Sequence, residues 1–277
     1  MHRLPQNGGF CGTVVGMKGY WVTLLILLLV LAGISLYSRF YGDGSLFPGL
    51  PHATAAAVET AATVPSPSAT PELTPSATPD QAEFSDTSSL LLCANKKHKL
   101  PDGYVPSDLT SVTVNGTVTS YTLRREAAEA MAKMFAGAAQ DGVQLVLTSA
   151  YRSYEYQYQL YNGYVAQYGS ATADTISSRP GYSDHQTGLA ADITSSTYSA
   201  LNQGFAQDSG GIWLAAHAHE YGFIMRYPQG KQDITGYAFE PWHFRYIGVD
   251  NASALYAAGD NETFEEYYSV EGGDYAS

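Results

Sequence analysis

One polar stretch of the sequence brings a histidine and a carboxylate close together. In "GYSDHQTGLAADITSS", residues 181–196, His185 and Asp192 lie seven residues apart. Further along the chain, "EPWH" supplies His243, with Glu240 three residues before it. Imidazole and carboxylate groups are the usual ligands of a hydrolytic zinc ion, which takes three protein ligands and leaves one position open for water. The competing interpretation is ordinary surface chemistry, because Asp and His are also common at exposed turns.

Hydrolysis at such a metal also needs a carboxylate that acts as general base. Glu240 is the candidate, because Pro241 favours an extended conformation at the residue before it and so fixes the direction of Glu240. The sequence therefore suggests His185, Asp192 and His243 as metal ligands, with Glu240 as base.

A non-haem iron oxygenase is a second interpretation of two histidines and one carboxylate. Such enzymes usually place the first histidine and the carboxylate two residues apart, whereas His185 and Asp192 are seven apart. An oxygenase also has no use for Glu240. We assign no ligand role to the remaining histidines, which are His2, His52, His98, His217 and His219.

Composition excludes several other classes. The chain has 277 residues, a formal net charge of -12 and 22 tyrosines. No basic run is present that could neutralise a nucleic-acid backbone, so no nucleic-acid partner is expected. Cys11 and Cys93 are too few for a disulfide framework or a cysteine-rich metal site.

The hydrophobic pattern predicts helices and strands mixed along the chain, an α+β class. Asp192 should lie on the strand face opposite Leu189, Ala191 and Ile193, because successive side chains alternate. The tyrosines of the second helix are expected to pack inward. The expected helices cover residues 120–142, 154–169 and 211–223, and the expected strand regions cover 143–149, 187–193 and 237–248.

The first part of the chain has the pattern of a membrane anchor followed by a stalk. Residues 20–37 carry no charge, and at about 1.5 Å per residue they just span a bilayer core of about 30 Å. A cleaved signal peptide is the main alternative. We expect a cytoplasmic tail (1–19), a single transmembrane anchor (20–38), a disordered Pro/Ser/Thr/Ala-rich linker (39–88), a catalytic domain (89–269) and a C-terminal tail (270–277). Basic residues before the anchor and none between Arg39 and Lys96 favour an extracellular domain.

Taken in order, the motifs resemble a known family. The segments "SAYRSYEYQ", "RPGYSDHQTGLAADI", "WLAAHAHEYGFIMRYP" and "EPWHFRYIG" are similar to those of VanY-type D-alanyl-D-alanine carboxypeptidases. These zinc peptidases share the signatures S-x-H-x(6)-D and E-x-x-H. The similarity runs from about Leu91 to Gly248, and the ordered set is far more specific than any single motif.

The resemblance implies an α+β fold with a central antiparallel sheet and flanking helices, one zinc ion and peptidoglycan stem peptides as substrate. It implies that Arg152 holds the substrate carbonyl and its developing oxyanion. By the same resemblance, Gln157 and Ser183 contact the terminal carboxylate. Asp184 stands where the family often has Glu.

Two alternatives stay open from the sequence. One is an L,D-carboxypeptidase that acts on tetrapeptide stems. The other is a wall-binding module of the same fold without catalysis, against which the presence of Glu240 argues, because binding needs only the groove and hydrolysis needs the base. We expect a monomer in the bacterial cell membrane.

Overall fold

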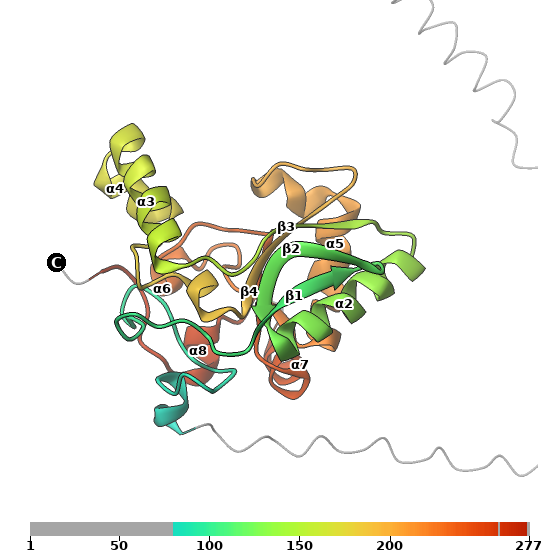
Figure 1. Cartoon of the computed structure of the whole chain (residues 1–277), viewed down its shortest axis with the longest axis horizontal. Coiled ribbons are helices and arrows are strands. Elements are labelled where there is room, and N and C mark those ends of the chain that lie inside the picture. Colours follow the sequence, from blue (N-terminus) through green and yellow to red (C-terminus); the bar gives the residue numbers. More distant parts are fainter. Residues whose placement is uncertain (1–79, 260, 276–277) are drawn as a thin grey trace, which may run out of the picture. The chain divides into compact units, whose positions relative to one another are not determined.

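The computed structural model describes residues 80–259 and 261–275. Figure 1 shows helices gathered around short strands. The elements, in chain order, are η1 (Gln81–Phe84), β1 (Leu109–Val114), β2 (Thr117–Arg124), α2 (Arg125–Gln140), β3 (Leu145–Ser149), α3 (Tyr154–Tyr168), α4 (Ser170–Ile176), η2 (Asp184–Thr187), β4 (Ala190–Ser195), η3 (Gln203–Gln207), α5 (Ser209–His217), η4 (Ala218–Tyr221), β5 (Phe223–Met225), α6 (Gln232–Thr235), β6 (His243–Tyr246), α7 (Val249–Ala258) and α8 (Phe264–Tyr268).

A four-stranded antiparallel sheet in the order β3-β4-β6-β5 forms the centre of the fold. Leu189, Ala191 and Ile193 point from one face into the main hydrophobic core, as the alternation predicts. Helices α2 and α5 cover this face with side chains that include Met131 and Leu214. The predicted α+β class and antiparallel sheet are confirmed.

The first predicted helix begins later than expected. Residues 120–124 belong to β2, which pairs with β1, and α2 starts at Arg125. Asn115 and Gly116 both have positive φ (49° and 79°), the conformation that a tight hairpin turn requires. Because of this turn, the β-branched run that follows it pairs with β1 as strand β2. The helical pattern that we read from Leu123 onward therefore becomes a helix only from Arg125.

Helix α3 follows its predicted range, but the prediction that its tyrosines pack inward is wrong. Only Gln157 and Tyr161 are buried in this helix. Most of its tyrosines are exposed, by 40–57% of their surface: Tyr154, Tyr156, Tyr158 and Tyr168. The helix lies at the side of the molecule beside α4, so only a narrow face is covered (Figure 1).

The helix predicted over 211–223 divides into two parts. The α-helix α5 ends at His217 and continues as the 3-10 turn η4, after which Gly222 closes the run in the left-handed conformation with φ of 85°. Gly222 is therefore the stop that the sequence predicts.

A second hydrophobic cluster extends the packed region on both sides of the range 89–269. Phe84 and Val270 are buried in this cluster together with Leu91, Ile247 and Leu255. Phe84 and Val270, which lie just outside the range 89–269, therefore pack with residues inside it.

Among residues 80–259 and 261–275, no helix is long and apolar enough to cross a membrane. The anchor expected over residues 20–38 lies outside the described residues, as does the expected linker up to residue 79.

Candidate metal centre and substrate pocket

Two neighbouring strands bring the predicted metal ligands together. Asp192 of β4 is the direct cross-strand partner of His243 of β6, so both side chains lie on the same face of the sheet. His185 lies in η2, and Gly188, with φ of 69°, turns the chain from η2 toward β4. All three ligand candidates are buried. The three side chains, which come from motifs far apart in the sequence, therefore form one cluster on the sheet face opposite the main core.

The atoms of this cluster lie close enough together to hold one metal ion. Nε2 of His185 lies 3.4 Å from Oδ2 of Asp192, and Nδ1 of His243 lies 3.3 Å from Oδ1 of the same carboxylate. One ligand atom from each residue lies within 4.8 Å of the other two.

Hydrogen bonding leaves the ligand atoms free for a metal. Nδ1 of His185 is 2.7 Å from the carbonyl oxygen of Ala150, to which its N–H donates, so Nε2 faces the cluster. Within the described part of the chain, Nε2 of His185 and Oδ1 of Asp192 are buried without a hydrogen-bond partner. Buried polar atoms normally have partners. A metal ion satisfies both, so the residues present fit a zinc ion.

Asp184 orients His243 from behind. Nε2 of His243 donates to Oδ2 of Asp184 at 3.4 Å, which directs Nδ1 toward the cluster. The Asp184 carboxylate in turn accepts a hydrogen bond from Nη1 of Arg245. Burial opposes ionisation of Asp184, but Arg245 and His243 hold its pKa below the ordinary value. A carboxylate that fixes the ring of a ligand histidine is a common support of zinc sites.

Burial and neighbouring charges shift the pKa values of the two ligand histidines in opposite directions. Burial and the positive charge of Arg152 lower the pKa of His185 to about 4. Burial also favours neutral His243, but the carboxylates of Asp184 and Asp192 outweigh it and raise the pKa of His243 to about 9. Since a ligand imidazole is neutral, a metal ion bound at this site would replace the proton that His243 carries without it.

Glu240 stands beside the ligands without belonging to the three-residue cluster. Its Oε2 lies 3.5 Å from Nδ1 of His243. Its backbone N–H donates to the Tyr227 carbonyl at 3.1 Å, and its carbonyl accepts from His243 N at 3.1 Å, so the turn before β6 is fixed. Burial raises the pKa of Glu240 to about 7, although the positive charge of His243 opposes this. A carboxylate whose pKa lies near neutrality is suited to general acid–base work.

Arg152 reaches the cluster from the loop between β3 and α3. Its Nη2 donates to Oδ2 of Asp192 at 3.0 Å, and its Nη1 donates to Oε1 of Gln157 at 3.3 Å. Nε of Arg152 is buried and has no partner among the described residues, so it remains a donor available to a substrate. The structure thus brings the predicted Arg152 to the metal site.

Gln157 lies behind Arg152, in the interior of the protein. It is fully buried and does not line the pocket. Its Nε2 donates to Ser177 Oγ at 3.1 Å and to the Ser178 carbonyl at 2.7 Å, while its Oε1 accepts from Arg152. Both N–H groups of the amide are thus hydrogen-bonded within the protein, and Gln157 holds Arg152 in this structure, while its contact with a substrate carboxylate stays a prediction.

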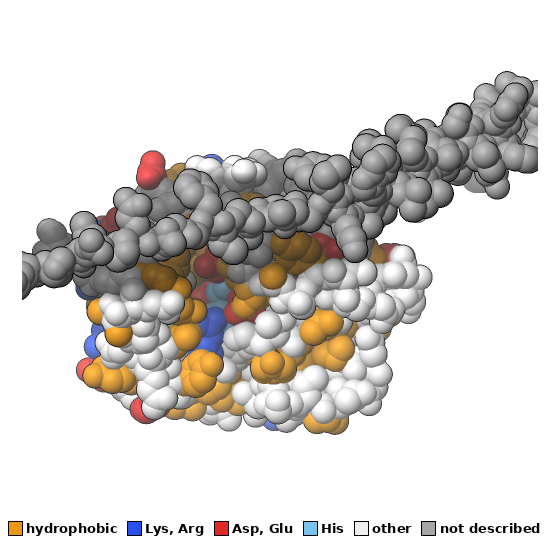
Figure 2. Space-filling view, turned by 90° about the horizontal axis from the view of Figure 1, so that it is seen from above, with side chains coloured by type: hydrophobic (Ala, Val, Ile, Leu, Met, Phe, Trp, Pro, Cys, Tyr) orange, Lys and Arg blue, Asp and Glu red, His pale blue; other side chains and the backbone are white. Residues whose placement is uncertain are grey.

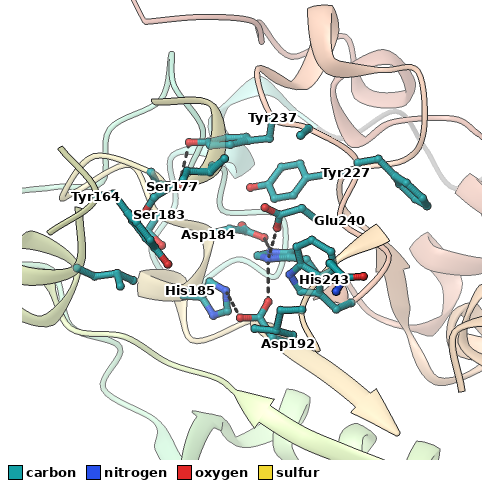
Figure 3. A pocket seen from close by; sticks show the side chains of 18 of the residues that line it. Tyr164, Ser177, Ser183, Asp184, His185, Asp192, Tyr227, Tyr237, Glu240 and His243 are labelled. Carbon is teal, nitrogen blue, oxygen red and sulfur yellow. Dashed lines mark hydrogen bonds and ion pairs between the residues drawn. The ribbon is translucent and has the colours of Figure 1, made fainter. Parts of the chain in front are cut away.

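The cluster lies in a cavity of about 440 Å³. Figure 2 shows histidine, acidic and basic side chains at the bottom of a hollow with hydrophobic side chains around it. Ser183 lines the cavity. The sequence analysis did not single out four further residues that line it, which are Ser177, Ser178, Tyr227 and Tyr237. In Figure 3 the side chains of Tyr227 and Glu240 lie on the same side of the metal ligands.

Comparison with known proteins identifies the family. Residues 120–249 match the family described as VanY, D-alanyl-D-alanine carboxypeptidase. The chain is 40% identical over 186 residues to "Putative carboxypeptidase YodJ" of Bacillus subtilis (strain 168), covering 65% of this chain and 67% of that protein. It is 36% identical over 148 residues to a D-alanyl-D-alanine carboxypeptidase of Enterococcus faecalis, covering 50% of this chain and 52% of the relative. The matches thus span about two thirds and about half of these two relatives.

Solved structures agree with this assignment. The LdcB LD-carboxypeptidase is 38% identical with a TM-score of 0.60, over 67% of this chain and 87% of that one. VanYB in complex with D-alanine-D-alanine is 32% identical with a TM-score of 0.56, over 66% and 98%. A variant of the vancomycin resistance D,D-pentapeptidase VanY, solved with Zn(II), is 32% identical with a TM-score of 0.55, over 65% and 98%. The chain therefore belongs to the VanY family of carboxypeptidases, and its buried His-Asp-His cluster is its candidate metal site.

Proposed function

We propose that this protein is a zinc-dependent D-alanyl-D-alanine carboxypeptidase that removes the C-terminal D-alanine from peptidoglycan stem peptides. The observation that carries the proposal is the buried Glu240 beside a complete three-ligand set at the bottom of an open cavity. A binding module needs the cavity but not a base with a raised pKa. The ligand of VanYB, D-alanine-D-alanine, supports the substrate class.

Each residue then has a defined task in hydrolysis. Zinc, held by His185, Asp192 and His243, supplies Lewis acidity for the water and for the scissile carbonyl. Glu240 takes a proton from the attacking water and passes it to the departing amine as the C–N bond breaks. Arg152 donates to the carbonyl oxygen as negative charge develops there.

Ser183 is suited to bind the end of the substrate. It precedes η2 as the N-cap residue but makes no side-chain capping hydrogen bond, so its hydroxyl is free to donate into the cavity. Together with Arg152 it provides donors for a terminal carboxylate. A substrate without that carboxylate would leave buried donors unpaired, at a cost of about 1–3 kcal/mol each.

An L,D-carboxypeptidase is the second candidate. Its support is the similarity to LdcB and to the L,D-carboxypeptidase DacB of Streptococcus pneumoniae, both at 38% identity. The two activities differ in the stem peptide that fills the cavity, while the zinc site, Glu240 and Arg152 serve both.

Defined stem peptides test the proposal directly. We expect the purified protein to release one D-alanine from a pentapeptide ending in D-Ala-D-Ala, as seen by mass spectrometry. The C-terminally amidated pentapeptide should be cut at least about tenfold more slowly, because a lost donor–carboxylate pairing of about 1–3 kcal/mol corresponds to about 5- to 150-fold. Release from the tetrapeptide alone would establish the L,D-activity instead, and cleavage of internal bonds would establish an endopeptidase.

We propose that residues 20–38 anchor the protein in the bacterial membrane, with the catalytic domain outside. The uncharged run and the lack of basic residues between Arg39 and Lys96 support this arrangement. Protease added to intact cells should remove the domain and leave a short membrane-held fragment. A mature protein that begins after residue 37 would show a cleaved signal peptide.

A further inference from the structure

Residues beyond the expected end of the domain contact the segment that forms one wall of the cavity. The hydroxyl of Tyr275 accepts a hydrogen bond from the backbone N–H of Arg179 at 2.7 Å. The Arg179 guanidinium lies over the Tyr275 ring at 4.0 Å from its centroid, and Tyr182 packs edge-on against the same ring at 5.2 Å. Tyr275 thus contacts both sides of Pro180, in the segment 177–183 that leads to η2.

The same segment is hydrogen-bonded to the side chain that holds Arg152. The carbonyl of Ser178, the residue before Arg179, accepts from Nε2 of Gln157 at 2.7 Å. Gln157 accepts from Nη1 of Arg152, whose Nη2 donates to the zinc ligand Asp192. A continuous chain of contacts therefore leads from Tyr275 to the metal site.

A second set of contacts joins Tyr275 to the cavity wall. Nζ of Lys96, a fully buried side chain, lies 4.8 Å from the Tyr237 ring centroid and 5.3 Å from that of Tyr275. It donates to the Gly236 carbonyl at 2.6 Å. The Tyr237 hydroxyl, which lines the cavity, donates to Ser178 Oγ at 2.8 Å. Both routes meet at Ser178.

We propose that Tyr275 is a positioning residue that acts through Ser178 and Gln157 to hold Arg152 in its catalytic orientation. This inference rests on the proposed function of Arg152. Without the Tyr275 hydroxyl the Arg179 N–H loses its partner, and without the ring the segment 177–183 loses its support. Arg152 then shifts relative to the scissile carbonyl, and small displacements of a reacting group are costly in rate.

Substitution of Tyr275 in the full chain tests this. Tyr275→Ala should lower kcat for the D-alanine-terminated pentapeptide by about tenfold, with zinc still at one equivalent. Tyr275→Phe, which keeps the ring and fold, should show a smaller loss in the same direction. Tyr256→Phe is the matched control, since this tyrosine stacks on His219 outside the cavity. It should leave kcat unchanged.

A double-mutant cycle distinguishes the positioning of Arg152 through Gln157 from a general loss of rigidity in the fold. Gln157→Ala breaks the chain of contacts between Tyr275 and Arg152. Tyr275→Phe should therefore lower kcat clearly less in the Gln157→Ala background than in the wild type. If the two residues acted independently, their losses in kcat would multiply, which means that the free-energy changes would add. Additive free-energy losses in this cycle, or an unchanged kcat in both Tyr275 variants, would overturn the proposal.

Hydrogen exchange supplies a readout that does not depend on turnover. Amides in residues 177–183 and 150–157 should exchange faster in Tyr275→Phe than in the wild type and the control variant. Faster exchange with an inactive wild type would refute the proposed function and leave the coupling standing. Unchanged exchange in both segments would refute the coupling itself.

Discussion

Glu240→Gln should give a folded, zinc-loaded protein whose kcat for a D-alanine-terminated stem peptide is lower by about 10²–10⁴-fold, the usual contribution of a positioned acid–base group. Glutamine has nearly the same shape as glutamate but cannot take a proton from water. Glu240 lies 3.5 Å from Nδ1 of His243 and is not one of the three clustered ligands, so zinc should stay.

The same substitution should not lower the melting temperature. Burial raises the pKa of Glu240, which shows that the charged carboxylate is disfavoured in its site. A neutral amide avoids the free-energy cost of burying a charged carboxylate. Active sites often keep a catalytic group that lowers the stability of the fold. The measurements are kcat, zinc content and thermal unfolding, with Tyr256→Phe as the control, since Tyr256 stacks on His219 outside the cavity. Near-normal turnover of Glu240→Gln would show that another group is the base.

The fold could be predicted where one local signal dominated. The alternation of side chains along a strand correctly predicted that Asp192 lies on the face opposite Leu189 and Ile193. Gly222 ends a helical segment, as its residue type predicts. The prediction failed where a neighbouring element decided the outcome. We expected the helix to begin at residue 120, but residues 120–124 pair with β1, and that pairing depends on the turn at Asn115. The tyrosines of α3 are exposed because few other elements pack against this helix. The number of neighbours cannot be read from the sequence of the helix itself.

The candidate site could be predicted as a set of ligands but not as a network. His185, Asp192, His243, Glu240 and Arg152 carry chemistry in their residue types, and the structure brings all of them together. The support given by Gln157 and Tyr275 arises from hydrogen bonds between segments far apart in the sequence. A glutamine near a catalytic arginine has the same sequence signature whether it faces the substrate or the protein interior. Only the burial of its amide distinguishes the two.

His243→Ala should lose most of the zinc from the purified protein. The substitution removes one of three ligands, and Asp192 and His185 alone leave the ion with two protein ligands, fewer than hydrolytic zinc sites use. The lost imidazole also removes one of the hydrogen-bond donors to Asp184, while Arg245 still donates to that carboxylate. Metal analysis after exhaustive dialysis should show about one equivalent in the wild type and far less in the variant.

Asp184→Asn provides a graded comparison, because it keeps all three ligands and weakens only the support behind His243. Loss of such a support typically costs about 10- to 100-fold in metal affinity, so this variant should hold zinc more weakly than the wild type and more tightly than His243→Ala. The order of the three affinities, measured by competition with a chelator, tests the geometry in which Nδ1 of His243 binds the metal and Nε2 faces Asp184. If His243→Ala kept its full zinc content, the ligand set would be wrong. If Asp184→Asn bound zinc as tightly as the wild type, the orientation of the His243 ring would be set by the β4–β6 pairing alone.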